Sequence, residues 1–445
     1  MMIEIRAIGG YEEIGRNMTA VNVGGEVIIL DMGLELESYI NISEDDDIVD
    51  VDTAVLEKAG AIPKISALKD WKEKVIAIVP SHAHLDHIGA IPFLLKEFDA
   101  PLICTPFTSA VIQKILEDEK IKVKNQFRTL YANSSVKLSD KITLEFIHVT
   151  HSTPQAVIVA LHTKYGTILY ANDFKFDLYP VLGKKPNFKR LEELGKNKSV
   201  LALVTESTYA DDFRKMPSES VARQMLKDIM IGSYSQGKAI IITTFASHLA
   251  RLKSIIDFSK KLNRKPIFLG RSFAKYISAG EETGIIDFSK DSEVIKYRTH
   301  INRTLKKVLA DGKEKYVLIV SGHQGEPKAA LSRMARGETP FVFDGEDHII
   351  FSSPVIPNPL NQQRRKELEA MLSHHHVRIF RDIHVSGHAA REDLRDLLLM
   401  VKPEHIIPTH GEHEHKGAFL ELAKEMGLNI EKVHILKNGE GIQLD

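Results

Sequence analysis

Three histidines and an aspartate lie within six consecutive residues, in the order His-x-His-x-Asp-His over residues 82–87. In an extended loop, His82, His84 and Asp86 alternate and therefore share one side of the chain. His87 then begins a predicted helix and can reach the same point from another direction. Imidazoles and a carboxylate at this spacing are ligands for divalent metals such as Zn²⁺ or Mn²⁺. The alternative, a histidine-rich surface turn, does not explain why the motif directly follows a buried strand.

One loop cannot close two metal sites, so further ligands must come from other parts of the chain. Each of three candidates follows a short apolar run that reads as a strand: His151 after residues 143–147, Asp173 after 167–170, and His410 after 405–407. Open α/β folds place ligands just beyond the carboxyl ends of their strands. Taken singly, each residue is more often structural, but together with the first motif they make a candidate set for two metal ions.

The elements that must position these residues are short apolar runs alternating with amphipathic segments, which is an α/β pattern. In the first half we expect strands at residues 27–30, 75–79, 143–147, 167–170 and 200–204, and helices at 88–98 and 110–116. A second block gives strands at 239–242, 266–269 and 316–320 with a helix at 248–262, followed by strand and helix units at 377–380, 391–401, 405–407 and 418–426. Two polar stretches, the acidic residues 43–52 and residues 287–303, read as loops or insertions.

Composition limits the class of protein further. The 445 residues are long enough for two domains, and 59 basic against 60 acidic side chains leave a net charge of −1. Net charge therefore gives no support for nucleic acid binding, and any basic surface must be local. A single cysteine excludes a disulfide within the chain and suits the reducing cytoplasm, where we expect this protein. Neither a signal peptide nor a membrane span is predicted.

The histidine loop followed along the chain by His151, Asp173 and His410 resembles the motifs of the metallo-β-lactamase superfamily, whose fold is an αββα sandwich. A strand-end aspartate, here Asp31, precedes the histidine loop in that superfamily. The resemblance implies a catalytic centre with two divalent ions, zinc or else manganese, that share Asp173. The implied ligands are His82, His84 and His151 for one ion, and Asp86, His87 and His410 for the other. Asp31 would orient the loop without binding metal.

Beyond Asp173 the sequence resembles the β-CASP nucleases, a branch of the superfamily with an inserted α/β domain. Their acidic motif after a strand matches Glu206, and their next motif, a histidine, matches His388. Within that branch, four segments resemble the ribonuclease J family: residues 9–18, 321–327, 331–335 and 384–388. Little chain follows His410, which is similar to the shorter, archaeal form of that family.

The resemblance predicts a domain organisation in three segments and an enzymatic activity. Residues 1–205 begin the metallo-β-lactamase domain, 206–381 form the β-CASP insert, and 382–445 complete the first domain. The implied function is hydrolysis of RNA to 5′-phosphate and 3′-hydroxyl products, mainly 5′→3′ from 5′-monophosphate ends, in RNA decay and maturation. The expected partner is single-stranded RNA, and we expect a homodimer. His388 is the candidate to protonate the leaving oxygen, with Glu206 fixing its tautomer.

Residues for RNA binding are predicted in three places. His384, Ser386 and the backbone at Gly387 precede a helix and suit a terminal phosphate, although Ser386 could simply cap that helix. The remaining candidates are Ser332 and Arg333 for the RNA backbone, and Phe245, Ser247 and His248 for a channel in which Phe245 stacks on bases. Phe245 could equally belong to the core.

Several other functions remain open from the sequence. The archaeal relatives of messenger 3′-end processing endonucleases carry N-terminal RNA-binding domains, whereas here the first strand is expected near residue 3. Enzymes that process tRNA 3′ ends lack the insert, and a lactamase or thioesterase leaves His388 unexplained. A non-catalytic scaffold subunit would have lost ligands, yet every expected ligand type is present. The motifs leave a DNA-directed nuclease open.

Overall fold

The computed structural model describes residues 3–42, 52–356 and 359–444. Their chain divides into two compact units, of which the first takes the described residues of Met1–Leu178, Lys184–Met216 and Gly387–Asp445, and the second those of Tyr179–Gly183 and Pro217–Ser386. The domain boundaries expected at 205/206 and 381/382 stay a prediction. All but the last residue of the acidic stretch 43–52 lie outside the described residues.

The first unit contains a seven-stranded and a six-stranded sheet. The larger has the order β19-β1-β2-β3-β4-β5-β6. Its strands are β1 (Ile3–Gly9), β2 (Met18–Val23), β3 (Glu26–Leu30), β4 (Val75–Val79), β5 (Leu102–Cys104), β6 (Phe127–Thr129) and β19 (Gly441–Leu444). The smaller has the order β18-β11-β10-β9-β8-β7. Its strands are β7 (Ser134–Lys137), β8 (Thr143–His148), β9 (Val157–Thr163), β10 (Gly166–Ala171), β11 (Val200–Glu206) and β18 (His405–Thr409).

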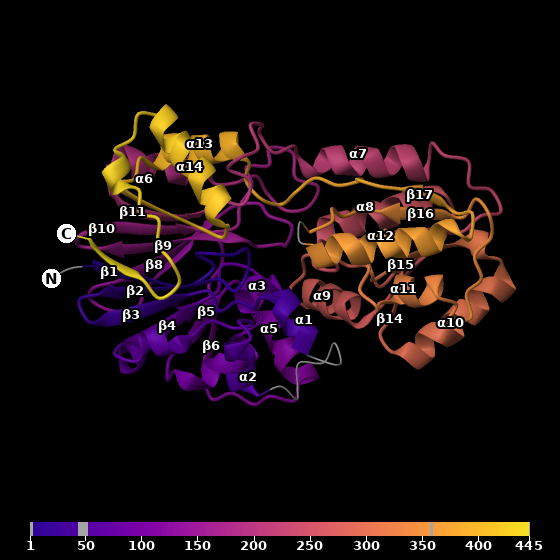
Figure 1. Ribbon diagram of the computed structural model, residues 1–445, viewed down its shortest axis with the longest axis horizontal. Coiled ribbons are helices and arrows are strands. Elements are labelled where there is room, and N and C mark those ends of the chain that lie inside the picture. Colours follow the sequence, from indigo (N-terminus) through magenta and orange to yellow (C-terminus); the bar gives the residue numbers. More distant parts are fainter. Residues whose placement is uncertain (1–2, 43–51, 357–358, 445) are drawn as a thin grey trace. The chain divides into compact units, whose positions relative to one another are not determined.

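The two sheets pack face to face across one hydrophobic core. Alternate residues of β1, such as Ile3 and Ile5, join alternate residues of β9, such as Val159 and Leu161, in that core. Helices α6, α13 and α14 cover the outer face of the smaller sheet, and α2, α3 and α5 lie beyond the larger sheet in Figure 1. The unit is therefore a four-layer αββα sandwich.

Most helices of the first unit are short in the part of the chain that the structure describes. The helices are α1 (Leu36–Ile42), α2 (Thr53–Lys58), α3 (Leu85–Ile88), α4 (Ile91–Leu94), α5 (Pro106–Asp118), α6 (Phe188–Lys196), α13 (Arg391–Val401) and α14 (His413–Glu425). The single helix predicted over residues 88–98 is wrong, because α3 stops at Ile88 and α4 starts at Ile91. Pro92 has no N–H to continue a helix from the turn before it. The break leaves α3 as a single turn that presents the ligand motif.

The second unit is built on one parallel sheet of order β14-β13-β15-β12-β16-β17 (Figure 1). Its strands are β12 (Ile240–Thr243), β13 (Lys265–Leu269), β14 (Glu293–Ile295), β15 (Tyr316–Val320), β16 (His348–Phe351) and β17 (Arg378–Phe380). Its helices are α7 (Glu219–Met230), α8 (Leu249–Lys261), α9 (Arg271–Glu282), α10 (Arg298–Asp311), α11 (Ala330–Ala335) and α12 (Pro359–Ser373). Helices α10, α11 and α12 share one core with the sheet.

The loop predicted over residues 287–303 is wrong in part, since it holds β14 and the start of α10. β14 is an edge strand of three half-buried residues, and such a strand lacks the apolar run that marks a central one. Within the described residues, no helix has the length and apolar character needed to cross a membrane.

Candidate metal centre

All seven predicted ligands lie in the first unit, beyond the carboxyl ends of its strands. β3 and β4 run parallel, as do β10, β11 and β18, so the ends of these strands meet at common edges. The histidine loop directly follows β4, a strand of apolar and mostly buried residues that lies between β3 and β5 in its sheet. His151 follows β8, Asp173 follows β10 and His410 follows β18. Strand order, not proximity in the sequence, brings these residues together.

The first group of ligand atoms comes from His82, His84, His151 and Asp173. Oδ2 of Asp173 lies 3.5 Å from Nε2 of His82 and 3.4 Å from Nε2 of His151. Nδ1 of His84 lies 3.1 Å from Nε2 of His82 and 2.9 Å from Nε2 of His151. Three imidazoles and one carboxylate oxygen therefore converge on one point, which is a donor set that Zn²⁺ accepts.

The second group comes from Asp86, His87, His410 and again Asp173. Here Oδ1 of Asp173 lies 3.2 Å from Nε2 of His87 and 3.7 Å from Nε2 of His410. Oδ2 of Asp86 lies 3.5 Å from the same nitrogen of His87 and 3.7 Å from that of His410. The two oxygens of Asp173 thus face different groups.

The carboxylate of Asp173 tests whether the residues present fit metal ions. It is buried, and within the described residues neither of its oxygens has a hydrogen-bond partner. Nε2 of His410 is likewise buried without one. Leaving a buried carboxylate unpaired is costly, so such groups are normally hydrogen-bonded or bound to metal. The donor set and its unmade hydrogen bonds fit two divalent cations that share Asp173.

The second ring nitrogen of most of these histidines is held by a fixed partner. Nδ1 of His87 lies 2.7 Å from Oδ2 of Asp31, and Nδ1 of His151 lies 2.7 Å from the carbonyl oxygen of Gly387. Nδ1 of His82 lies 3.0 Å from Oγ of Ser81, which itself donates to Asp31. Contacts of this kind fix the tautomer that turns Nε2 toward a metal.

Asp31 is the centre of these contacts. Besides the His87 ring, its carboxylate accepts the backbone N–H of Ser81 at 2.7 Å and the hydroxyl of Tyr170 at 2.8 Å. Its φ of 60° is a conformation that few non-glycine residues adopt, and aspartate is among those that do. Asp31 therefore orients the loop and contributes no atom to either ligand group.

Asn17 was missed by the sequence prediction. Its Oδ1 lies 2.9 Å from Nδ1 of His410, and its Nδ2 lies 3.1 Å from both the carbonyl oxygen of Asp86 and Nε2 of His87. This buried amide links ligands from opposite ends of the chain. Asn17 lies in segment 9–18, which resembles the ribonuclease J family, and that was its only mark in the sequence. No local pattern indicated that it contacts His410.

A third group joins the same carboxylate. Nδ1 of His388 lies 2.7 Å from Oε2 of Glu206 and 3.7 Å from Oδ2 of Asp173. Burial opposes the charged imidazolium, but Glu206 and Asp173 outweigh it and raise the pKa of His388 to about 9. Glu206 also accepts the backbone N–H groups of Phe174 and Ala389, which fixes its orientation. The pair can hold a proton at neutral pH.

Burial lowers the pKa of four ligand histidines, whereas for His87 burial is outweighed by Asp173, Asp86 and Asp31, which raise its pKa. Burial and the neighbouring imidazoles hold the pKa values of His82 and His151 well below the usual range. Burial lowers the pKa of His84 to about 4 and also lowers that of His410. These rings are therefore neutral near pH 7, which is the state that binds metal.

The residues predicted to bind RNA lie mainly in the second unit. Phe245 follows β12, and its ring packs edge-on against His323 with centroids 4.4 Å apart and lies 6.3 Å from the ring of His384. Ser247 and His248 are buried at the start of α8. Gly387 belongs to the first unit, where a Cβ would come within 2.8 Å of the backbone nitrogen of Ser152.

Ser332 and Arg333 are buried, although residues that contact the RNA backbone are expected on the surface. On α11 their side chains are only 1% and 6% exposed. Ser386 is half-buried at the end of the second unit. The structure thus places His323 and His384 near the ring of Phe245, whereas Ser332 is not a surface residue.

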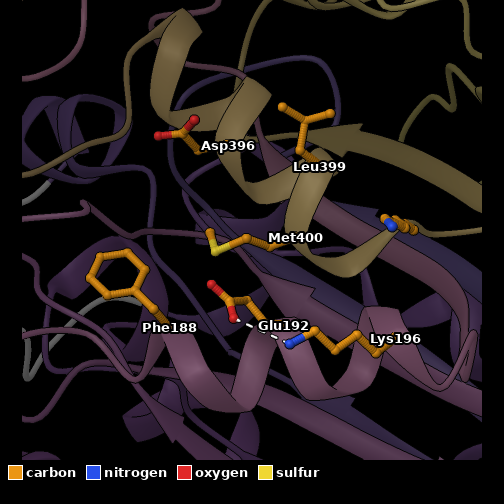
Figure 2. Close-up of a pocket in the computed structure, with 7 residues that line it drawn as sticks. Phe188, Glu192, Lys196, Asp396, Leu399 and Met400 are labelled. Carbon is orange, nitrogen blue, oxygen red and sulfur yellow. Dashed lines mark ion pairs between the residues drawn. The ribbon is translucent and has the colours of Figure 1, made fainter.

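A shallow groove on the first unit lies between α6 and α13, and Figure 2 shows its lining. Phe188, Leu399 and Met400 supply its apolar part, beside an ion pair of Lys196 with Glu192 at 3.7 Å. No histidine lines it, and it shares no residue with the metal-ligand groups. The groove is therefore separate from the candidate metal centre.

Comparison with family models defines the class of protein. Residues 12–206 match "Metallo-beta-lactamase superfamily", residues 237–366 match "Ribonuclease J, beta-CASP domain", and residues 375–436 match "Zn-dependent metallo-hydrolase RNA specificity domain". A solved structure from Enterococcus faecalis V583, of a protein of unknown function, covers all of both chains with a TM-score of 0.66 at 17% identity, which shows the fold alone. The chain is a metal-dependent hydrolase with a metallo-β-lactamase domain and a β-CASP domain, and the predicted fold class is confirmed.

Comparison with curated proteins then gives the family. The chain is 45% identical to "Ribonuclease J" of Methanocaldococcus jannaschii, covering 100% of this chain and 99% of the relative. It is 42% identical to "Ribonuclease J" of Pyrococcus abyssi, covering 100% and 97%. The chain belongs to the ribonuclease J family, so the resemblance predicted from the motifs is confirmed.

Proposed function

We propose that this protein hydrolyses single-stranded RNA at a centre of two divalent metal ions bridged by Asp173. The observation that carries the proposal is the buried carboxylate of Asp173, whose two oxygens face two separate groups of ligands. One ion would be held by His82, His84 and His151, and the other by Asp86, His87 and His410. Zinc is the expected metal, because the matched family model names it, and manganese is the alternative.

Two such ions lower the pKa of a water molecule and neutralise charge on the phosphate that is attacked. The protein's own residues fix the geometry of the donors. Asp31 holds the His87 ring, and Asn17 holds the His410 ring. Both contacts are made before substrate arrives, so little reorganisation is needed at the moment of reaction.

His388 is the proposed proton donor to the departing 3′-oxygen. Glu206 accepts from its Nδ1, so the proton available for transfer is on Nε2. The Glu206 carboxylate, 2.7 Å from Nδ1, raises the pKa of His388 and so favours the protonated ring that a general acid requires. This assignment yields 5′-phosphate and 3′-hydroxyl products and does not need the 2′-hydroxyl as a nucleophile.

The segment of residues 384–387 is the proposed pocket for a 5′-monophosphate, which makes the enzyme mainly a 5′→3′ exonuclease. Nη1 of Arg251 lies 3.5 Å from Nδ1 of His384 and can only donate, so the proton of this ring is on Nε2. That N–H and the hydroxyl of Ser386 are the proposed hydrogen-bond donors to the phosphate. Phe245, which packs near His384, is the proposed base-stacking residue. Ser247, Ser332 and Arg333 are the weaker candidates, because all three are buried.

Product analysis on 5′-labelled RNA tests the proposal. Zinc-loaded enzyme should release labelled mononucleotide from the start of the reaction, and more slowly from 5′-triphosphate RNA than from 5′-monophosphate RNA. Discrete internal fragments would show an endonuclease instead. Equal rates on 5′-monophosphate and 5′-triphosphate RNA would contradict the proposed phosphate pocket. Asp173→Asn is the matched control, because it keeps the side-chain volume and removes the shared charge.

We further expect a homodimer and a cytoplasmic location. The single cysteine suits a reducing compartment. Light scattering of the purified protein checks the dimer, since a mass of one chain would contradict it.

A further inference from the structure

The outward face of α10 is strongly basic. One stripe of this helix (Arg298–Asp311) packs into the core of the second unit through Ile301, Leu305 and Val308. The residues on the opposite side at helical spacing are Arg303, Lys306 and Lys307, all exposed. The whole chain has a net charge of only −1, so this concentration of cations is a local departure from its composition.

The charges on α10 work against the helix that carries them. Arg303 stands three residues before Lys306 and four before Lys307, where like charges repel across one turn. Arg298 begins the helix and Asp311 ends it, which opposes the helix dipole at both ends. Within the described residues, none of these four cations forms an ion pair. A face that costs stability in the free protein is explained by a polyanionic partner.

Aromatic and further basic side chains lie where α10 begins. Tyr297 is 56% exposed. The ring of His300 lies 6.1 Å from the Tyr297 ring, and the ammonium of Lys296 lies 5.5 Å from the centre of the Tyr297 ring. On α11, burial together with the charge of Arg298 lowers the pKa of Arg333. Nε of Arg333 makes no hydrogen bond within the described residues, and it lies 3.7 Å from a carboxylate oxygen of Glu338. Exposed aromatic rings among cations are the combination that binds single-stranded nucleic acid.

We propose that α10 and the adjoining Tyr297 form a binding surface for single-stranded RNA, with cations on phosphates and the tyrosine ring on a base. The partner class rests on the proposed function, because RNA is the polyanion that this enzyme must hold. Such contacts are independent of sequence and weaken with salt, by a slope of about 0.7 per phosphate contact for single strands. A surface of this kind raises affinity for long RNA without taking part in bond cleavage.

A triple charge reversal, Arg303→Glu, Lys306→Glu and Lys307→Glu, tests the surface. The control reverses three exposed lysines of the first unit, Lys137→Glu, Lys189→Glu and Lys196→Glu, so that the total charge change is equal. Binding of a labelled RNA of about 30 nucleotides is measured by fluorescence anisotropy over a series of salt concentrations, on zinc-loaded proteins that all also carry His388→Ala so that the RNA is not cut. Hydrolysis of an RNA of about five nucleotides is measured on the same variants with His388 intact.

The α10 variant should bind the long RNA at least about tenfold more weakly at low salt, with a salt slope smaller by about 2. The control variant should bind the long RNA as the unmodified protein does, and both triple variants should hydrolyse the short RNA at its rate. Circular dichroism should show that both variants are folded. Tyr297→Ala should weaken binding without changing the salt slope. Equal loss in both triple variants, or none in the α10 variant, overturns the surface. A wild-type protein that binds in this way but cuts no RNA would overturn the proposed function alone.

Discussion

Replacing Asn17 by alanine should loosen one metal ion and leave the other in place. The substitution removes the acceptor for Nδ1 of His410, at 2.9 Å, and the donor to the carbonyl oxygen of Asp86, at 3.1 Å. Both partners belong to the second group of ligands, and neither contact involves His82, His84 or His151. Loss of an outer partner of a metal ligand typically weakens metal binding 10- to 100-fold. That range corresponds to about 1.4–2.7 kcal/mol.

The assay is a zinc titration against a chromogenic chelator, which measures the binding step of each ion. In Asn17→Ala, one binding step should move by the stated factor while the other keeps its midpoint. Asn125→Ala is the matched control, because it removes an amide that makes two hydrogen bonds, to the backbone carbonyls of Phe98 and Ala100, but contacts no ligand. It should leave both steps unchanged.

The reasoning is refuted if Asn17→Ala releases zinc at both sites equally, or at neither. Equal release would show a general loss of packing, because the buried Asn17 side chain also fills space. No release would show that His410 keeps its orientation without the amide.

Three further predictions concern proton transfer and stability. His388→Ala should retain zinc but lose activity by about 10²–10⁴-fold, the usual contribution of a general acid, and normal turnover would remove the assignment. Glu206→Gln removes the charge that raises the pKa of His388, so the alkaline fall in activity should begin at lower pH, and an unmoved pH–rate profile would contradict the pairing. Burial opposes the charge of Glu145, but His162 and Arg190 prevail and lower its pKa to about 2. The stabilisation by the charged carboxylate is complete above its ordinary pKa and is lost as pH falls toward 2. Glu145→Gln should therefore lower the free energy of unfolding by about 1–2 kcal/mol at pH 7 and by almost nothing near pH 2. Chemical denaturation at the two pH values measures this difference.

Local patterns carried much of the architecture. The strand expected at residues 75–79 is β4, and the helix at 391–401 is α13, both with the expected bounds. An uninterrupted apolar run and a clear amphipathic period specify such elements without tertiary information. The ligand motif could be recognised for a related reason, since its four side chains lie within one turn of chain.

Contacts between distant parts of the chain could not be predicted. Asn17 acts on His410 across 393 positions, and only the fold puts them side by side. Burial of Ser332 and Arg333 likewise depends on helices that pack around α11, which no pattern inside α11 reveals. The short edge strand β14 was missed because its stability comes from pairing with β13.

Anomalous diffraction from zinc-loaded crystals tests the shared carboxylate most directly. The account predicts two zinc peaks about 3.5–4 Å apart, with Asp173 between them. One peak should be surrounded by His82, His84 and His151, and the other by Asp86, His87 and His410. A single peak, or two peaks of which either lacks Asp173 as a ligand, would contradict the account.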